Sequence, residues 1–220
     1  MQKAMRGVNA ENRRLGWPEI AMGIGLHTGE VVVGNIGSTK RSKYGVVGRT
    51  VNLTARIESY TVGGQVLVSP SLRDAAGPGL ILGEEVKVHA KGMGEALRCR
   101  ELLGHEDHPE LSLEEEAEGL TTLGEPLPFA LMGMTGKHLD GILQPGTLLS
   151  LSTRQAVIEV ASPLVAYANI VLRWETEAGA AAAEVYAKVI RPVDKSLRRY
   201  LISFTSVPPA VQERLQRLTA

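Results

Sequence analysis

The chain has 220 residues and a mass of 23.6 kDa, enough for one large domain or two small ones, and 44% of its residues are hydrophobic. Its 24 basic and 24 acidic side chains give a formal net charge of zero, so no global field attracts it to nucleic acid or anionic lipid. The single cysteine, Cys99, excludes an internal disulfide and a cysteine-rich metal site, and favours a reducing cytoplasm as its location.

The N-terminal segment is predicted to be an amphipathic helix. Apolar side chains at helical spacing cover residues 2–14, and Gly16 and Pro18 supply a stop. Charges spread through this segment leave no hydrophobic stretch for a signal peptide, and no apolar run in the chain reaches the roughly 20 residues that cross a bilayer. We therefore expect no membrane segment in this chain.

Two β-rich runs follow, at residues 20–26 and 30–33, and the intervening His-Thr-Gly suits a tight reversal. We expect these runs to pair as an antiparallel hairpin. Residues 34–45 are then predicted to form an exposed basic loop, whose three cations are most simply a solvated tip: Lys40, Arg41 and Lys43.

Residues 49–60 fit a helix on which two polar stripes separate two apolar sectors. One stripe carries Asn52 and Arg56 one turn apart, and the other carries Thr54 and Glu58. Periodicity alone does not show which stripe faces water. Judged from the helix alone, Arg56 is most simply a surface residue that forms a salt bridge with Glu58 or another acid.

Three further elements complete the first half of the chain. Residues 65–69 are predicted to be a short buried strand, after which Ser69 and Pro70 begin a helical turn. Residues 81–102 predict two strands around a glycine turn that carries Lys91. Lys91 is interpreted equally well as an exposed cation at the tip of the hairpin.

Residues 105–125 are acidic, poor in aromatic residues and interrupted by Pro109, which predicts a linker between two modules. His105 and His108 lie there among acids. A metal site is not expected, because no rigid element presents the two imidazoles in a fixed geometry.

The last part of the chain contains six short β-rich runs at regular spacing, which predicts a small antiparallel barrel or sandwich. Pro208 and Pro209 then begin a final amphipathic helix over residues 210–218. The six runs cover residues 129–132, 146–151, 156–160, 169–174, 184–190 and 200–204.

Several ordered segments in residues 1–104 resemble the C-terminal half of class III adenylate/guanylate cyclase catalytic domains. The segments are GIGLHTGEVVVGNIGS, YGVVGRTVNLTARIES, GQVLVS and KGMGEALRCREL. The resemblance implies an α+β chain: a partial ferredoxin-like cyclase half-domain at residues 1–104, an acidic linker at 105–125 and a β-barrel with a C-terminal helix at 126–220. It also implies a lyase of bacterial second-messenger signalling that converts ATP, or GTP, to a cyclic nucleotide and pyrophosphate.

The resemblance assigns roles to single residues. Arg56 resembles the family's transition-state arginine, and Asn52 resembles the asparagine that hydrogen-bonds near the ribose and positions the 3′-hydroxyl. Lys91 resembles a lysine that contacts the terminal phosphates in some members. Gly45 stands where members usually have a purine-reading threonine or aspartate, which leaves ATP and GTP both open, and Arg49 replaces a common aspartate or asparagine.

Members of this family hold two metal ions with two aspartates of the N-terminal half, and no residue before Met22 resembles those segments. We therefore expect Mg²⁺ or Mn²⁺ for the full-length enzyme but no metal ligands in this chain. Family sites form between two protomers, so this chain would supply only the Asn/Arg set, be inactive alone and need a homodimer or a cyclase-like partner subunit. Met1 is then expected to be an internal methionine of a longer cyclase. The remaining strands are expected to expose an edge and an apolar face.

Residues 126–220 more weakly resemble a PilZ domain, through GTLLSLSTRQAVIEV and YLISFTSVPPAVQERL. In the family's DxSxxG turn, Ser150 replaces the aspartate, Ser152 is kept and Gln155 replaces the glycine, and no paired arginines precede the barrel. Cyclic di-GMP binding is therefore not expected, and the barrel is predicted to be a docking or regulatory module. The alternative function is a non-catalytic cyclase-like interaction protein.

Overall fold

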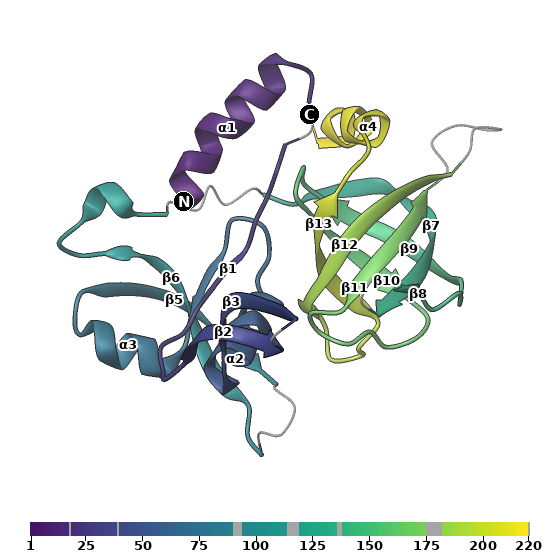
Figure 1. Ribbon diagram of the computed structural model, residues 1–220. Helices are drawn as coiled ribbons and strands as arrows, with labels where there is room; N and C mark the ends of the chain where they lie inside the picture. The colour runs from purple at the N-terminus through teal and green to yellow at the C-terminus, as the bar shows by residue number, and fades with distance from the viewer. Residues whose placement is uncertain are drawn as a thin grey trace. The chain divides into compact units, whose positions relative to one another are not determined.

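The computed structural model describes residues 1–17, 19–38, 40–89, 94–113, 119–135, 138–174 and 182–219. The chain divides into two compact units, Met1–Glu115 and Glu116–Ala220 (Figure 1). Among the described residues, no helix combines the length and the apolar character needed to cross a membrane.

The first unit is built on a four-stranded sheet with the strand order β1-β4-β6-β5. The central strand β4 is buried along its whole length because all three of its residues are apolar. The elements of this unit are α1 (Gln2–Arg14), β1 (Ile24–Leu26), β2 (Val32–Ser38), β3 (Arg41–Val47), α2 (Arg49–Glu58), β4 (Val66–Val68), α3 (Pro70–Ala76), β5 (Leu80–Val88), β6 (Leu97–His105) and the 3-10 turn η1 (Pro109–Leu111).

The helices and most strands of this unit confirm the sequence-based expectations. Helix α1 covers the predicted residues 2–14, and α2 begins at Arg49 as expected. Ser69 is the N-cap of α3, where its side chain accepts a hydrogen bond from the backbone N–H of Leu72 at 3.2 Å.

The expected hairpin between residues 20–26 and 30–33 is wrong. Strand β1 pairs in parallel with β4, whereas β2 pairs with β3 in a separate two-stranded ribbon. Most of residues 34–45, expected to be a loop, therefore lies in strands. A local β pattern does not specify its partner, and the short β1 gains more by lying against the buried β4 than against a ribbon exposed on both faces.

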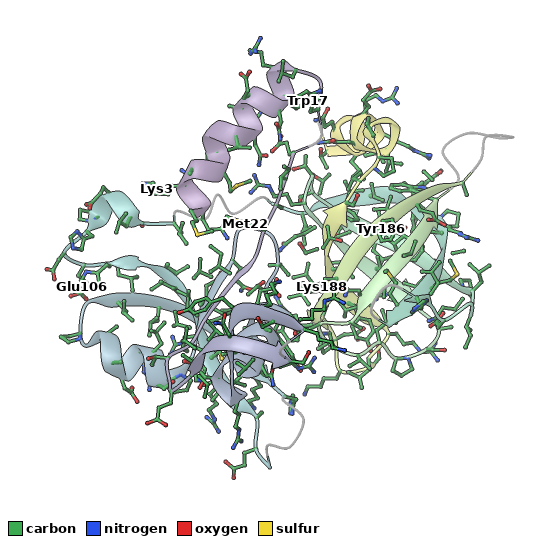
Figure 2. The ribbon with its side chains drawn as sticks, viewed as in Figure 1. Lys3, Trp17, Met22, Glu106, Tyr186 and Lys188 are labelled. Atoms are coloured by element: carbon green, nitrogen blue, oxygen red, sulfur yellow. The ribbon has the colours of Figure 1, made fainter. Side chains whose placement is uncertain are left out.

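Helix α1 is attached to the rest of the first unit mainly through polar groups. The Gln2 side-chain amide donates to the carbonyl oxygens of Met22 at 2.8 Å and Gln65 at 3.3 Å, and the Asn9 side chain bonds both backbone groups of Ile20. Lys3, at the first turn of α1 in Figure 2, donates to the backbone carbonyl of Glu110. These contacts place α1 with few apolar groups buried beneath it.

The β2–β3 ribbon carries exposed apolar side chains on both strands. Val32 is 66% exposed and Tyr44 is 70% exposed, and Val33, Val46 and Val47 are each more than two-fifths exposed. The ribbon therefore exposes apolar side chains to solvent.

The second unit is a closed antiparallel barrel in which β11, β12, β13, β10, β9 and β7 follow one another and β7 pairs back with β11. This confirms the predicted barrel. Its elements are β7 (Thr121–Thr135), β8 (His138–Leu139), β9 (Gln144–Leu151), β10 (Gln155–Val160), β11 (Asn169–Trp174), β12 (Ala183–Pro192), β13 (Arg199–Ser206) and α4 (Pro209–Thr219).

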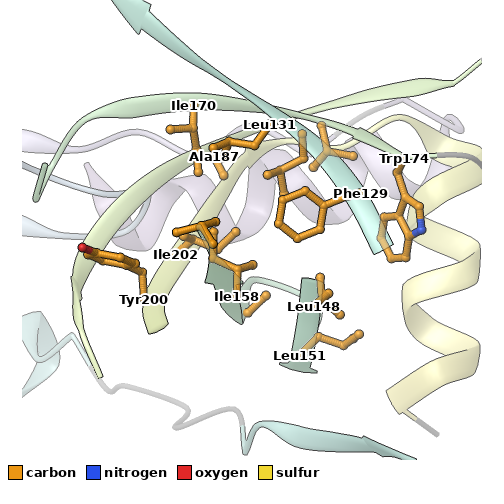
Figure 3. Close-up of a cluster of buried hydrophobic side chains, with 14 of the residues drawn as sticks. Phe129, Leu131, Leu148, Leu151, Ile158, Ile170, Trp174, Ala187, Tyr200 and Ile202 are labelled. Atoms are coloured by element: carbon orange, nitrogen blue, oxygen red, sulfur yellow. The ribbon is translucent and has the colours of Figure 1, made fainter. Parts of the chain in front are cut away.

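The interior of the barrel is filled by alternating apolar side chains of these strands (Figure 3). Val211 and Leu215 of α4 join the same cluster, so the helix closes part of the barrel. The buried Tyr200 hydroxyl accepts the N–H of Leu164 at 3.0 Å and donates to the carbonyl of Leu197 at 2.9 Å, which ties two loops to β13.

Replacing Ile158 with alanine should lower the free energy of unfolding of the second unit by about 3 kcal/mol, because Ile158 is fully buried and its loss leaves a cavity. Urea unfolding followed by the fluorescence of Trp174, in a Trp17→Phe background, measures this change. The control Val165→Ala alters a side chain that is 75% exposed and should shift stability by less than about 0.5 kcal/mol. An equal effect of the two substitutions contradicts this description of the core.

Cys99 should react slowly with a thiol reagent while the protein is folded. Burial raises the pKa of the Cys99 thiol to about 11, so at pH 8 its thiolate fraction is about two orders of magnitude below that of an ordinary cysteine. Labelling with dithionitrobenzoate should be nearly absent in native protein and complete after denaturation. Rapid native labelling would show that β6 opens readily.

Candidate functional site

Helix α2 is held close to β1 by a contact between the two backbones. A Cβ atom added to Gly25 would lie 2.8 Å from the Cα atom of Glu58 and closer still to its backbone nitrogen. Only glycine therefore allows this approach. Ile57 is fully buried on the same helix, which fixes the rotation of α2 about its axis.

With this rotation, one polar stripe of α2 is exposed at both of its positions and the other at only one. Asn52 and Arg56 are both exposed, one turn apart on the outer side of α2. Of the other stripe, Glu58 is exposed and Thr54 is half-buried, with its hydroxyl donating to the carbonyl of Thr50 at 2.9 Å. The structure thus brings Asn52 and Arg56 together as a pair of exposed donors.

Arg56 is held by groups outside α2. Its Nε donates to the backbone carbonyl of His89 at 2.8 Å, and its Nη2 donates to the hydroxyl of Tyr60 at 3.3 Å. Its guanidinium carbon lies 5.0 Å from the centre of the Tyr60 ring. Within the described ranges, Arg56 makes no ion pair with Glu58 or any other acid, so the simplest expectation for this residue is wrong there.

An open pocket of about 630 Å³ lies on the other side of α2. It is lined by residues that include Gly25, His27, Thr50, Thr54 and Glu58, and neither Asn52 nor Arg56 is among them. The pocket and the Asn52/Arg56 pair are therefore separate features of the first unit.

His27 lies at this pocket in a contact that the sequence did not predict. Its Nδ1 is 2.8 Å from the hydroxyl of Ser69 and 3.1 Å from that of Ser71, and burial lowers the pKa of the imidazole. A lone histidine in a turn gave no signal for this contact. It arises because β1 runs beside β4, which ends one residue before Ser69.

The remaining site residues lie on different elements. Gly45 is in β3 opposite Gly34, and a Cβ added to it would touch only the Cδ1 of Ile36 at 3.8 Å, so there is room for a larger side chain. Lys91 lies outside the described residues. Arg49 is the exposed first residue of α2, whose first turn has no acidic side chain.

No group of three or more histidine, cysteine or acidic side chains that could hold a metal ion occurs in the part of the chain that the structure describes. The nearest arrangement is at the end of β6, where the rings of His105 and His108 are 5.3 Å apart. His108 Nδ1 lies 3.2 Å from a carboxylate oxygen of Glu110, and His105 Nδ1 lies 3.9 Å from one of Asp107. These residues do not fit a Mg²⁺ or Mn²⁺ pair.

In the second unit, Ser152 has a structural role at the turn between β9 and β10. Its hydroxyl accepts the N–H groups of Arg154 and Gln155 at 3.2 and 3.0 Å, and its own N–H donates to the carbonyl of Gln155. Ser150 pairs with Val157 in the β9–β10 ladder. The positions that resemble the PilZ turn are thus used by the turn itself.

Comparisons with known proteins show what the first unit is similar to. Residues 1–97 match the family described as "Adenylate and Guanylate cyclase catalytic domain". The chain is 35% identical over 113 residues to "Adenylate cyclase" of Anabaena cylindrica, and this match covers 46% of this chain and 22% of that protein. It is 36% identical over 58 residues to "Adenylate cyclase 1" of Rhizobium meliloti (strain 1021), and this match covers 26% of this chain and 9% of that protein.

A solved structure of the guanylyl cyclase Cya2 is also similar, with 48% sequence identity and a TM-score of 0.48. The match covers 51% of this chain and 57% of that chain. Residues 1–97 thus carry similarity to the catalytic domain of adenylate and guanylate cyclases, which confirms that part of the expected resemblance. The matched stretch spans about a fifth or less of the two curated relatives. The PilZ resemblance of the second unit stays a prediction.

Replacing Gly25 with alanine should destabilise the first unit by more than about 2 kcal/mol, because the added methyl group meets the backbone of α2 at Glu58. The matched control is Gly45→Ala, which should have a much smaller effect because its methyl group meets only the Cδ1 of Ile36, at an ordinary contact distance of 3.8 Å. Urea unfolding followed by circular dichroism compares the two variants. Equal stability of both would contradict the close approach of α2 to β1.

Proposed function

We propose that the first unit is the part of a class III nucleotide cyclase, with a partial ferredoxin-like fold, that supplies an asparagine and an arginine to a shared active site. The observation that carries this proposal is the exposed pair Asn52 and Arg56 on one side of α2, within a segment that matches the cyclase family. The proposed reaction converts ATP, in preference to GTP, to a cyclic nucleotide and pyrophosphate in bacterial signalling.

The chemistry of cyclisation suits these two side chains. The 3′-hydroxyl of the ribose attacks the α-phosphorus, and negative charge grows on the phosphoryl oxygens as pyrophosphate leaves. A guanidinium donates to such oxygens through a rigid fork and stays charged at every working pH. Removing one preorganised donor of this kind typically raises the barrier by about 3 kcal/mol.

The spacing of the pair also fits one nucleotide. Residues four apart on a helix are displaced by about 6 Å along its axis, so both side chains can reach a single ligand. Asn52 is then placed to hydrogen-bond near the ribose while Arg56 contacts the phosphates. Gly45 of β3 offers a purine no side-chain contact of its own.

A partner protomer has to complete the site. The described residues of this chain do not gather carboxylates for Mg²⁺ or Mn²⁺, so the metal ligands are proposed to come from a second cyclase protomer. The exposed apolar side chains of the β2–β3 ribbon are compatible with burial in such an assembly. Alone, the chain is expected to be inactive.

The second candidate function is a non-catalytic interaction protein in which the cyclase-like unit pairs with another subunit. The engagement of Arg56 by the carbonyl of His89 favours this candidate, since it shows that the guanidinium has a use within the fold itself. In both candidates we propose the barrel as a docking or regulatory module. Its packed apolar interior and the closed turn at Ser152 support a role at its surface.

Arg56→Ala should strongly reduce cyclic nucleotide formation by a complemented enzyme. The assay mixes this chain with a cyclase catalytic protomer that carries the metal-binding aspartates but whose own asparagine and arginine are alanine, so only the shared site is intact. With ATP and Mn²⁺, product should form from the mixture and from neither chain alone. Arg56→Ala should then lower kcat at least about 100-fold and Asn52→Ala about 10-fold, because each removes a transition-state donor.

The matched control is Arg73→Ala, since Arg73 is an exposed arginine on α3 that pairs with Asp74 at 3.2 Å. This variant should leave turnover unchanged. Unchanged turnover in Arg56→Ala would remove Arg56 from the mechanism, and no product from the mixture would favour the interaction protein.

A further inference from the structure

Tyr60 is the centre of a set of hydrogen bonds around Arg56. Its hydroxyl accepts the backbone N–H of His89 at 3.2 Å and the Nη2 of Arg56 at 3.3 Å, and it lies 3.5 Å from the carbonyl of His89. The same carbonyl accepts the Nε of Arg56 at 2.8 Å. One hydroxyl group and one peptide carbonyl thus accept hydrogen bonds from one edge of the guanidinium.

We propose that Tyr60 and the backbone of His89 form a bracket that positions Arg56 for its substrate, with Tyr60 as a positioning residue. This inference rests on the proposed function, because it concerns the same arginine. Tyr60 follows Arg56 by one helical turn, directly after α2 ends, and is only 9% exposed. His89 directly follows β5. The bracket therefore joins α2 to the sheet.

The bracket leaves the outer fork of the guanidinium available. A guanidinium carries five N–H donors, which form a side fork of Nε and Nη2 and an end fork of Nη1 and Nη2. The bracket uses the side fork. Within the described residues no hydrogen bond involves Nη1, so the end fork can donate two parallel bonds to a phosphate group.

The ring of Tyr60 adds to this restraint because the guanidinium lies over its face at 5.0 Å from the centroid. An unrestrained arginine samples many rotamers, and ordering it on substrate binding costs conformational entropy. A side chain already held by two hydrogen bonds and a ring face loses less freedom at that step. A lysine at position 56 could not reproduce the planar side fork.

Tyr60→Phe separates positioning from packing, since it keeps the ring and removes the hydroxyl. In the complemented assay the kcat of this variant should fall about fivefold, the effect of losing the one hydrogen bond between Tyr60 and Arg56. The KM for ATP should be unchanged. In an Arg56→Ala background, Tyr60→Phe should have no further effect, because the bracket then has nothing to position. Additive effects of the two substitutions overturn the proposal.

The control is Tyr186→Phe in the second unit, which removes a hydroxyl that donates to Glu184 at 3.3 Å, a bond of similar length. It should leave kcat unchanged. A loss of kcat in this control equal to that of Tyr60→Phe overturns the specific role of Tyr60.

A nuclear magnetic resonance measurement on the chain alone tests the bracket without activity. The Arg56 Nε–H signal, assigned by its loss in Arg56→Ala, should exchange slowly with water in the wild type and about fivefold faster in Tyr60→Phe. A rapidly exchanging wild-type signal overturns the bracket without need of any Tyr60 variant.

The two measurements separate the possible failures. If Arg56→Ala abolishes turnover while Tyr60→Phe matches the wild type in kcat and in Nε–H exchange, the bracket is wrong and the proposed function stands. If Arg56→Ala leaves turnover unchanged, the proposed function fails and the positioning role fails with it. The exchange rates then report only whether the contact exists.

Discussion

The close approach of α2 to β1 is the constraint on which the first unit depends. Gly25 admits the helix backbone at Glu58, and Ile57 is buried beside that contact. Together they fix both the distance of the helix from the sheet and its rotation. Asn52 and Arg56 face outward as a consequence of that packing, not of their own polarity.

The two units solve the problem of exposed strand edges differently. In the second unit, β7 pairs with both β9 and β11, so the sheet closes on itself around one apolar cluster. In the first unit, β1 ends the sheet and the β2–β3 ribbon stands as a separate pair of strands with apolar side chains in water. The first unit therefore leaves a strand edge and apolar side chains exposed, whereas the barrel strands surround a buried core.

The geometry around Arg56 connects this packing to chemistry. Its guanidinium is tied to the carbonyl of His89 and to Tyr60, while Asn52 lies free of that network on the same side of the helix. Both side chains lie within residues 1–97, the stretch that matches the cyclase family. Activity is thus a property that we propose for an assembly.

The sequence by itself determined the elements that depend on neighbouring residues. The helical spacing of apolar residues predicted the helix over residues 2–14 and the start of α2, and the alternation of apolar and polar residues predicted the barrel strands. These predictions succeed because backbone periodicity and capping depend on residues only a few positions apart. Only the tertiary structure decided that β1 pairs with β4 and not with β2, that His27 meets Ser69 across 42 residues, and that Tyr60 meets His89 across 29. Such contacts join segments that are distant along the chain, and no local pattern encodes which distant backbone will complete them.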